Sequence, residues 1–234
     1  MLSGVRWIAV VALVVSWPAT GEQLTTRFLA REDVPLAAYV AARRLEARNE
    51  RFKVEGWLEA CVALSPDTGF HFEVTREGGS SYIRNGVLRK ALDGERDVIA
   101  SGEAARASLS PANYLFEREA AQGAMGEAGI RLTPRRKDGL LISGRLVVSD
   151  PEADLLRVEG RLAKSPSFWT KSVDVVRRYG WRGGIRVPIE MTSTADIRLA
   201  GRSTFRMTID YVAINGATVF RADSSPSPCL VTQN

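Results

Sequence analysis

Apolar and polar positions alternate with a period of two along most of this chain. In residues 51–65 and 70–77 the apolar or small side chains fall on one face and most charged ones on the other. A period of two is typical of a strand that buries one face. From residue 113 onward seven more segments follow this pattern, namely 113–119, 129–136, 139–149, 154–165, 171–181, 184–201 and 202–216. Turn residues separate them, so the pattern predicts a sheet of about nine strands.

Two other segments carry apolar residues at spacings of three and four, which is typical of helices. The first is residues 33–49, where Asp33 can cap a helix and Pro35 suits its first turn. The second is residues 82–100, where Ile83, Val87 and Ala91 share one face. The sequence therefore predicts one helix before the strands and another inserted among them.

A short sequence recurs within the predicted strands. Val-Glu-Gly stands at residues 54–56 and 158–160, and Gly-Arg-Leu stands at 144–146 and 160–162. A glycine inside a strand suits a bend or a bulge. The repeats therefore indicate strands that are polar outside, apolar inside and bent near the middle, as in a strongly curved antiparallel sheet.

The ends of the chain differ from the middle. Arg6 precedes an apolar run over residues 7–17, and Ala19 and Gly21 follow, which is the pattern of a secretory signal cut after Gly21. An uncleaved anchor is the alternative, although a membrane span needs about 20 apolar residues. We expect a signal peptide at 1–21, one domain at 22–216 and a flexible Ser/Pro-containing tail at 217–234.

Charge and cysteines narrow the class of protein. The chain has 32 Lys and Arg against 27 Asp and Glu, interleaved, which does not indicate a nucleic-acid partner. The basic excess suits solubility, or contact with an anionic membrane surface. Cys61 and Cys229 are able to form a disulfide in an oxidising compartment if the tail folds back, and otherwise stay as thiols.

Catalytic patterns are weak. His71 is the single histidine, so neither the usual metal cluster nor a cofactor site is predicted, and no Gly-x-Ser-x-Gly elbow occurs. Glu55, Glu59 and Glu159 could form a glycosidase pair, but they alternate with basic residues and cross-strand ion pairing explains them more simply. We therefore predict that the protein is not an enzyme.

The apolar face of the sheet must be covered. The two predicted helices are rich in Ala, Arg and Gly, so they have too few large apolar side chains to cover the whole apolar face of the sheet. We therefore expect a partly filled hydrophobic cavity. The inward residues would line it, with ordinary core packing as the alternative for each: Val54, Leu58, Val62, Phe70, Phe72, Leu146, Val158, Leu162, Phe205 and Met207. Phe168 and Trp169 beside a turn either contact a membrane or partner, or close the end of the cavity.

The order of elements, together with the segments "NYLFE", "GRL", "EGRLAKSP" and "STFRMTIDY", resembles the LolA/LolB-like lipoprotein-carrier superfamily over residues 34–216. The resemblance implies a mainly β (α+β) fold, an unclosed and strongly curved antiparallel β-barrel with about two helices covering its open side. It also implies a periplasmic carrier of lipid or lipoprotein acyl chains, without a cofactor, moving cargo from an inner-membrane donor to an outer-membrane acceptor. The chain lacks a cysteine for lipidation after the apolar run, which favours the soluble carrier.

The sequence is also compatible with two other functions. One is an envelope-stress or regulatory module of the same fold, which binds a protein and carries no cargo. The other is an outer-membrane barrel, which needs strands that are apolar outside and aromatic girdles at both ends. The internal helices and the scarcity of aromatic residues at strand ends disfavour that barrel.

Overall fold

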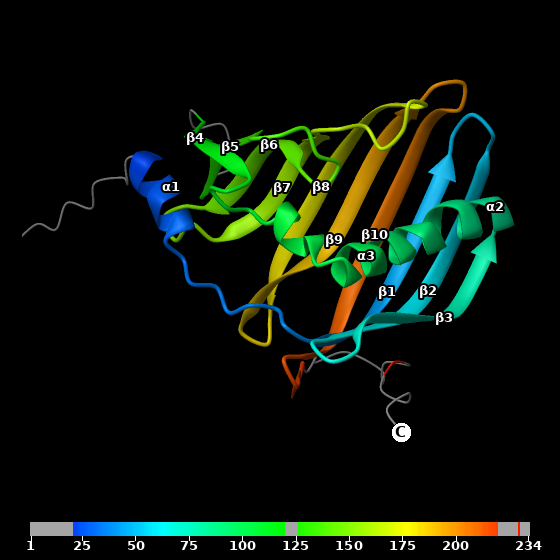
Figure 1. Ribbon diagram of the computed structural model, residues 1–234, viewed down its shortest axis with the longest axis horizontal. Helices are drawn as coiled ribbons and strands as arrows, with labels where there is room; N and C mark the ends of the chain where they lie inside the picture. The colour runs from blue at the N-terminus through cyan, green and yellow to red at the C-terminus, as the bar shows by residue number, and fades with distance from the viewer. Residues whose placement is uncertain (1–20, 120–125, 220–228, 230–234) are drawn as a thin grey trace, which may run out of the picture.

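The computed structural model describes residues 21–119, 126–219 and 229. Its main feature is one antiparallel sheet of 11 strands in the order β3-β2-β1-β10-β9-β8-β7-β6-β5-β4, with β11 paired to β10. The bounds of the strands are β1 Tyr39–Asn49, β2 Val54–Ser65, β3 Gly69–Gly79, β4 Tyr114–Arg118, β5 Glu127–Pro134, β6 Ile142–Ser149, β7 Leu155–Leu162, β8 Thr170–Arg182, β9 Ile185–Ile197, β10 Gly201–Ile214 and β11 Ala217–Thr218. Among the described residues the edge strands β3 and β4 do not pair, so the sheet is unclosed (Figure 1).

Helices cover one face of this curved sheet (Figure 1). A continuous helical segment crosses the strands near β1 and β10, and α1 lies at the far end beside β4. The helical elements are α1 Gly21–Leu29, α2 Ser81–Ile83, the π-helical turn η1 Arg84–Leu88, α3 Arg89–Ala100 and the 3-10 turn η2 Glu103–Ala107. The prediction of a mainly β, unclosed antiparallel barrel with two helical covers is confirmed, as is the predicted helix at 82–100.

The prediction of a helix at 33–49 is wrong, because most of this segment is the strand β1. It pairs with β2 on one side and β10 on the other, from Tyr39 to Asn49. Every second residue of β1 is buried, including the charged Arg43. The alternation of apolar and polar residues is interrupted in the sequence, because the inward position 43 is an arginine. The alanines of this segment fit a helical spacing as well as a strand spacing, so the sequence pattern favoured a helix. Pairing on both edges then decides the structure, since tertiary context overrides weak local preference.

The inward face carries two hydrophobic cores. The first core lies under α2, η1 and α3 and includes Leu45, Leu58 and Leu88, all fully buried. The second core lies between α1 and strands β4 to β8 and includes Ile130, Leu146 and Val158. The two cores belong to opposite halves of one sheet, and β9 and β10 cross the region between them.

The outward face is charged, and ion pairs connect neighbouring strands on it. Arg44 of β1 lies 2.7 Å from Glu59 of β2, and Arg145 of β6 lies 2.5 Å from Glu159 of β7. Arg157 also pairs with Glu159, at 3.0 Å. Cross-strand ion pairing is therefore confirmed for Glu59 and Glu159, and explains why these acids stand in strands.

The strand glycines allow two backbones to approach closely. Gly144 of β6 faces Gly160 of β7 in the register of the sheet. A Cβ atom on either residue would collide with the backbone of the opposite strand. The glycine of each Gly-Arg-Leu repeat is therefore required by the close approach of the paired strands β6 and β7.

The predicted signal peptide at 1–21 lies outside the described residues except for Gly21, which begins α1. Most of the predicted tail at 217–234 also lies outside them. Within that tail, residues 217–218 form β11. In the described part of the chain, no helix combines the length and apolar character needed to cross a bilayer.

Candidate functional site: an apolar groove under the helical cover

An apolar groove of about 340 Å³ lies between the helical cover and the inward face of β9 and β10. Eight of its twelve lining residues have apolar side chains, and Arg48 is the single charged one. The lining comprises Ala47, Arg48, Ile83, Val87, Ala91, Met191, Ser193, Ala195, Ile197, Ser203, Thr204 and Phe205. The groove thus occupies the gap between the first and second cores.

Small side chains on the floor create this space. Ala47, Ser193, Ala195 and Ser203 stand at inward positions of adjacent strands, where the two cores carry Leu, Ile and Val. Opposite them, the helical cover presents the apolar residues Ile83, Val87 and Ala91 at a spacing of four. An apolar roof over a floor of small residues leaves room that the protein does not fill.

The cover is positioned by close packing at α2. A Cβ atom on Gly56 of β2 would lie 3.1 Å from Ile83 and 3.2 Å from the backbone oxygen of Ser80. Those distances are tighter than nearly all real Cβ contacts. The glycine of the first Val-Glu-Gly repeat therefore lets the helix sit against the sheet, which sets the height of the groove.

An ion pair between the buried Arg43 and the partly exposed Glu95 ties α3 to β1. The Arg43 guanidinium, on the inward face of β1, donates hydrogen bonds to both carboxylate oxygens of Glu95, at 2.5 and 2.9 Å. It also donates to the Tyr39 hydroxyl at 2.7 Å. Burial lowers the pKa of Arg43, but the hydrogen bonds and the charge of Glu95 outweigh it and raise the pKa above its ordinary value. Removing one partner of a buried pair leaves an uncompensated charge, so this contact holds the cover in place.

Two tyrosines complete this polar cluster. Tyr39 and Tyr211 meet edge to face with ring centroids 5.6 Å apart, and the Tyr211 hydroxyl donates to the backbone oxygen of Pro188. Burial raises the pKa of both hydroxyls well above the ordinary tyrosine value. Both stay protonated at neutral pH, and only the Tyr39 hydroxyl lies within hydrogen-bonding distance of Glu95 on the cover, at 3.4 Å.

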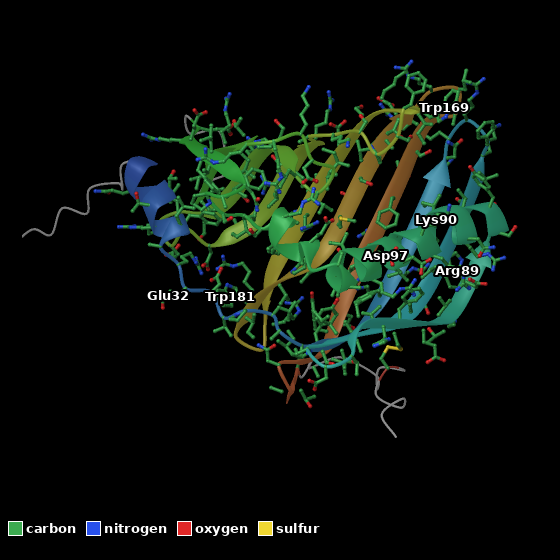
Figure 2. The ribbon with its side chains drawn as sticks, viewed as in Figure 1. Glu32, Arg89, Lys90, Asp97, Trp169 and Trp181 are labelled. Atoms are coloured by element: carbon green, nitrogen blue, oxygen red, sulfur yellow. A yellow bond between two sulfur atoms is a disulfide. The ribbon has the colours of Figure 1, made fainter. Side chains whose placement is uncertain are left out.

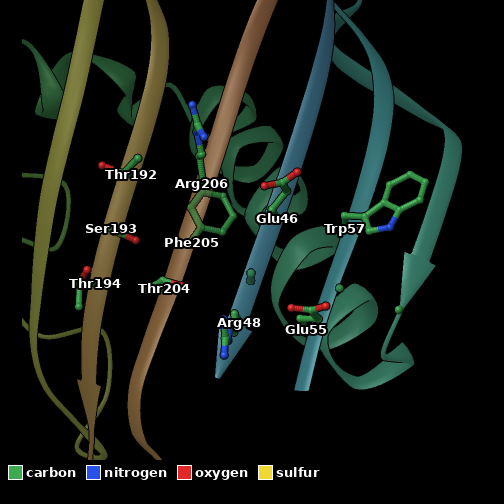
Figure 3. Close-up of a pocket in the computed structure, with 13 residues that line it drawn as sticks. Glu46, Arg48, Glu55, Trp57, Thr192, Ser193, Thr194, Thr204, Phe205 and Arg206 are labelled. Carbon is green, nitrogen blue, oxygen red and sulfur yellow. The ribbon is translucent and has the colours of Figure 1, made fainter. Parts of the chain in front are cut away.

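A second and larger hollow, of about 740 Å³, lies on the outward face of the same strands. Figure 3 views it from that face, with the helices behind the sheet. The lining includes the charged residues Glu46, Arg48, Glu55 and Arg206, together with Trp57, three threonines and one serine. Charged groups around an open depression favour water, so the smaller groove on the inward face is the better site for an apolar ligand.

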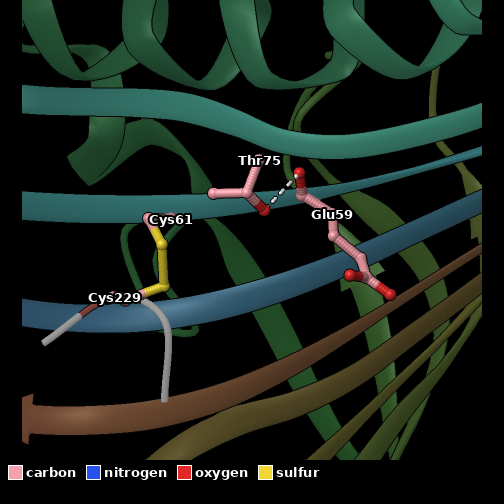
Figure 4. Close-up of a disulfide and its surroundings, with 4 residues drawn as sticks. All are labelled: Glu59, Cys61, Thr75 and Cys229. Atoms are coloured by element: carbon pink, nitrogen blue, oxygen red, sulfur yellow. Dashed lines mark hydrogen bonds between the residues drawn. A yellow bond between two sulfur atoms is a disulfide. The ribbon is translucent and has the colours of Figure 1, made fainter. Parts of the chain in front are cut away.

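Cys61 and Cys229 form a disulfide, which settles the alternatives left open by the sequence. The bond joins the outward side of β2 to a residue 168 positions later in the chain (Figure 4). Close by, the Thr75 hydroxyl of the edge strand β3 donates to the backbone oxygen of Glu59. The disulfide thus fastens the end of the chain to the half of the sheet that carries the first core.

The structure distributes the ten predicted cavity residues over both cores. Leu58, Val62 and Phe70 are buried members of the first core, and Val54, Phe72, Phe205 and Met207 pack against it. Leu146 and Val158 are buried members of the second core, and Leu162 packs against that. Of the ten, Phe205 lines the groove, while Val62 and Phe72 border a separate hollow of about 230 Å³ beside the disulfide.

Sequence reasoning missed most of the groove. Ile83, Val87 and Ala91 were recognised as one face of a helix but were not assigned to the cavity, and Met191, Ala195 and Ile197 were not singled out. A usable signal was present, because small residues interrupt the bulky inward face at 193 and 195. A ligand needs space, and space appears where side chains are small.

Within the described ranges no group of three His, Cys, Asp or Glu residues is placed to hold a metal ion. His71 is exposed, and its ring hydrogen-bonds to the backbone oxygen of Thr68 in the turn before β3. Its contacts are those of a turn residue, which agrees with the structural interpretation of a lone strand histidine.

The fold and the groove together define a curved, unclosed antiparallel half-barrel with a helical cover. No protein-family model matches the sequence, and no curated protein matches it. Among solved structures, the chain is similar to a putative outer membrane lipoprotein-sorting protein domain from Vibrio parahaemolyticus, at 10% identity over 81% of this chain and 89% of that one, with a TM-score of 0.39.

Two further solved structures are similar at the same level. A LolA superfamily protein from Nitrosomonas europaea aligns at 8% identity over 82% of this chain and 93% of its own, with a TM-score of 0.37. A DUF1329 family protein from Desulfovibrio piger aligns at 13% identity over 82% and 91%, with a TM-score of 0.38. The fold class described above rests on the strand order and pairing of this chain.

Proposed function

We propose that this protein is a periplasmic carrier that holds an acyl chain of a lipid or lipoprotein in the groove between the helical cover and strands β9 and β10. The observation that carries the proposal is the groove itself, an unfilled space of about 340 Å³ with mainly apolar walls. Pockets for small ligands occupy about 300–1,000 Å³. Each methylene buried there stabilises the complex by about 0.8 kcal/mol before association costs.

The architecture suits reversible loading. The groove lies between two hydrophobic cores, each of which contains fully buried side chains without any ligand. The cover is tied by the ion pair between Arg43 and Glu95, whose carboxylate side chain is 33% exposed. Arg84 and Arg89 of the cover also form ion pairs with Glu77 of β3, at 2.5 and 2.6 Å. Because ion pairs of partly exposed groups are able to break and form again, the cover is able to move away from the sheet and to return. In this proposal the cargo passes from an inner-membrane donor to an outer-membrane acceptor.

The test fills the groove and compares it with the outward face. Ala195→Leu places a larger side chain on the groove floor, and Thr194→Leu makes a similar change at the next position of β9, on the opposite face. We expect Ala195→Leu to weaken binding of a fluorescent fatty acid about tenfold, equivalent to about 1.4 kcal/mol, and Thr194→Leu to leave it within about twofold.

Native mass spectrometry of the purified protein, followed by lipid extraction, identifies any cargo. Stoichiometric acyl-containing species support the carrier. A ligand-free mass together with no uptake of the fatty acid contradicts it and favours a module that binds a protein partner. Loss of binding in Thr194→Leu alone moves the site to the outward hollow.

A further inference from the structure

We propose that the loops at one end of the sheet form a docking surface for anionic membranes. The surface, called the upper rim, consists of the β1–β2 loop (50–53), the β7–β8 loop with its flanks (163–171) and the β9–β10 loop with its flanks (198–202). The proposed carrier function supplies the biological reason for docking. Membrane binding itself is measured without an acyl ligand and is therefore tested independently of the carrier function.

The upper rim exposes large hydrophobic side chains. Phe168 and Leu199 are each 75% exposed, Phe52 is 59% exposed and Trp169 is 56% exposed. These are four of the nine large hydrophobic residues that are exposed in the described part of the chain. Scattered exposed residues need no explanation, but a cluster at adjoining loop tips marks an interaction site.

The three loops form one connected surface. The backbone N–H of Arg198 donates to the backbone oxygen of Trp169 at 2.7 Å, which joins the β9–β10 loop to the β7–β8 loop. The buried side chain of Asn49 donates to the backbone oxygen of Ala200 at 3.0 Å and accepts from the backbone N–H of Phe52 at 2.8 Å. The exposed apolar residues are therefore held together before any partner arrives, and docking orders little additional chain.

Within the rim, the aromatic rings and a cation are already stacked. Phe168 and Trp169 meet edge to face with ring centroids 5.7 Å apart, and the Arg198 guanidinium lies 4.8 Å from the Phe168 ring centre. Tryptophan and phenylalanine with neighbouring Arg or Lys are the residues that sit at a bilayer interface, where the ring enters the headgroup region and the cation meets phosphate.

The charge of the chain is concentrated on this surface. The three segments of the rim contain six basic residues and one acidic residue, a net charge of +5, and all seven are exposed. The whole chain has a formal net charge of +5, so the remaining positions are balanced. Basic residues beside a bilayer are each worth a measurable gain in affinity for anionic lipid, which makes an anionic membrane the occupant that fits this surface.

The rim also adjoins the groove. Ile197 and Ser203, which line the groove, are the residues that flank the β9–β10 loop with its exposed Leu199. A protein resting on a bilayer through this rim would have the groove beginning next to the headgroups. An acyl chain would then cross a short apolar path from the lipid into the groove.

The opposite end of the sheet supplies a matched control. Trp181 is 49% exposed and stacks against Arg186, with the guanidinium 4.9 Å from the ring centre. Figure 2 shows Trp169 and Trp181 far apart, near the two ends of β8. The two tryptophans have similar exposure, and a guanidinium stacks on Trp181 as Arg198 stacks on Phe168 beside Trp169. Trp181 also donates to the Asp154 carboxylate and lies outside the basic cluster.

The test is flotation of the purified protein with vesicles of phosphatidylcholine, with or without one third phosphatidylglycerol. We expect binding to the anionic vesicles, a loss of about tenfold in Phe168→Ser combined with Trp169→Ser, and no change in Trp181→Ser. Exchanging Lys164 and Arg198 for Glu should cause a comparable loss. Raising the salt from 0.1 to 1 M shortens the Debye length from about 10 to about 3 Å and should weaken binding to the same vesicles.

Each outcome decides the proposal. Selective loss in the rim variants supports it, with circular dichroism and thermal unfolding showing that they remain folded. No binding to anionic vesicles overturns it and leaves the rim to a protein partner, and equal loss in Trp181→Ser also overturns it. Fatty-acid binding without vesicles should be unchanged in the rim variants, so a failed carrier function and a failed docking surface give different results.

Discussion

The two halves of the inward face bury apolar side chains to different degrees of completeness. In the half that carries the second core, Leu146, Val148 and Val158 are almost fully buried. At the margin of the first core, Phe205 and Met207 stay partly exposed beside the groove. The groove lies where the two halves meet, because Phe205 packs against the first core while Met191 and Ala195 on the groove floor pack against the second. Similar alternating strands thus give a filled interior within the second half and an open binding space at its border with the first.

The difference teaches that inward orientation and ligand contact are separate properties. The second core fills its space with branched side chains and gains stability from each. The groove floor has alanine and serine instead, which bury less apolar surface and stabilise the fold less. The space that they leave is available to a ligand. Variants in the two regions should therefore separate stability from acyl binding.

The largest expected effect comes from the disulfide that fastens the chain to the first half. Cys61→Ser should lower the free energy of unfolding by about 4 kcal/mol, because the bond closes a very long loop in the unfolded chain. Urea unfolding with and without reductant measures it, and reduced wild-type protein should match the variant. Equal stability of the oxidised and reduced proteins would contradict the anchoring role.

The next effect contrasts a core residue with a groove residue. Leu146→Ala should cost about 3 kcal/mol of stability, because it leaves a cavity in a filled core, and should leave fatty-acid affinity within about twofold. Phe205→Ala should cost about 1 kcal/mol and weaken the affinity several-fold. The pair is measured by urea unfolding and fluorescence titration, and a loss of affinity in Leu146→Ala would remove the distinction between the regions.

A smaller effect is expected where the cover is tied to the first half. Glu95→Gln should lower stability by about 2 kcal/mol, because the Arg43 charge then stays buried without a counter-ion; partial exposure of Glu95 keeps the loss below that of a fully buried pair. Asp93→Asn on the same helix, whose pair with Arg96 is exposed, is the control and should change stability by less than about 0.5 kcal/mol. Equal effects of the two variants would mean that the pair does not hold the cover.

The smallest effect concerns a loop of the second half. The backbone N–H of Leu140 donates to the Asp138 carboxylate, and Arg106 and Arg136 pair with it, which lowers the pKa of Asp138 from 3.8 to about 2. A depressed pKa contributes stability that is complete above pH 4 and is lost as the pH falls from 4 to 2.

Asp138→Asn should therefore cost about 1 kcal/mol at pH 7, allowing for solvent screening, and the difference from wild type should shrink toward pH 2. Thermal unfolding at several pH values measures it. A difference that is constant from pH 7 to pH 2 would exclude the carboxylate as its source.

Much of the fold could be predicted from the period of two, because strands with one buried face follow directly from it. All nine predicted strands are present, and Gly144 and Gly160 mark the crossing of β6 and β7. The helix α1 and the short strand β11 were not predicted. Neither was β1, where Arg43 occupies an inward position. Its counter-ion comes from a helix 52 residues later, and a local pattern contains no sign of such a distant partner.

The site was less predictable than the fold. Periodicity identifies which residues face inward, and all ten residues predicted on that basis belong to one core or the other or pack against it. It does not show where packing leaves a gap, because the gap depends on how the helical cover lies over Ala47, Ser193 and Ala195. The volume of the groove depends on how strands and cover pack together, so it could not be predicted from the sequence pattern of any one element.

The measurement that tests the central claim most directly is photo-crosslinking with a diazirine-labelled fatty acid, followed by peptide mass spectrometry. The account predicts crosslinks in residues 83–91 of the cover and 191–197 of β9, and their loss in Ala195→Leu. Crosslinks confined to the second core, or to Trp57 and the threonines of the outward face, would contradict an acyl-binding groove beneath the cover.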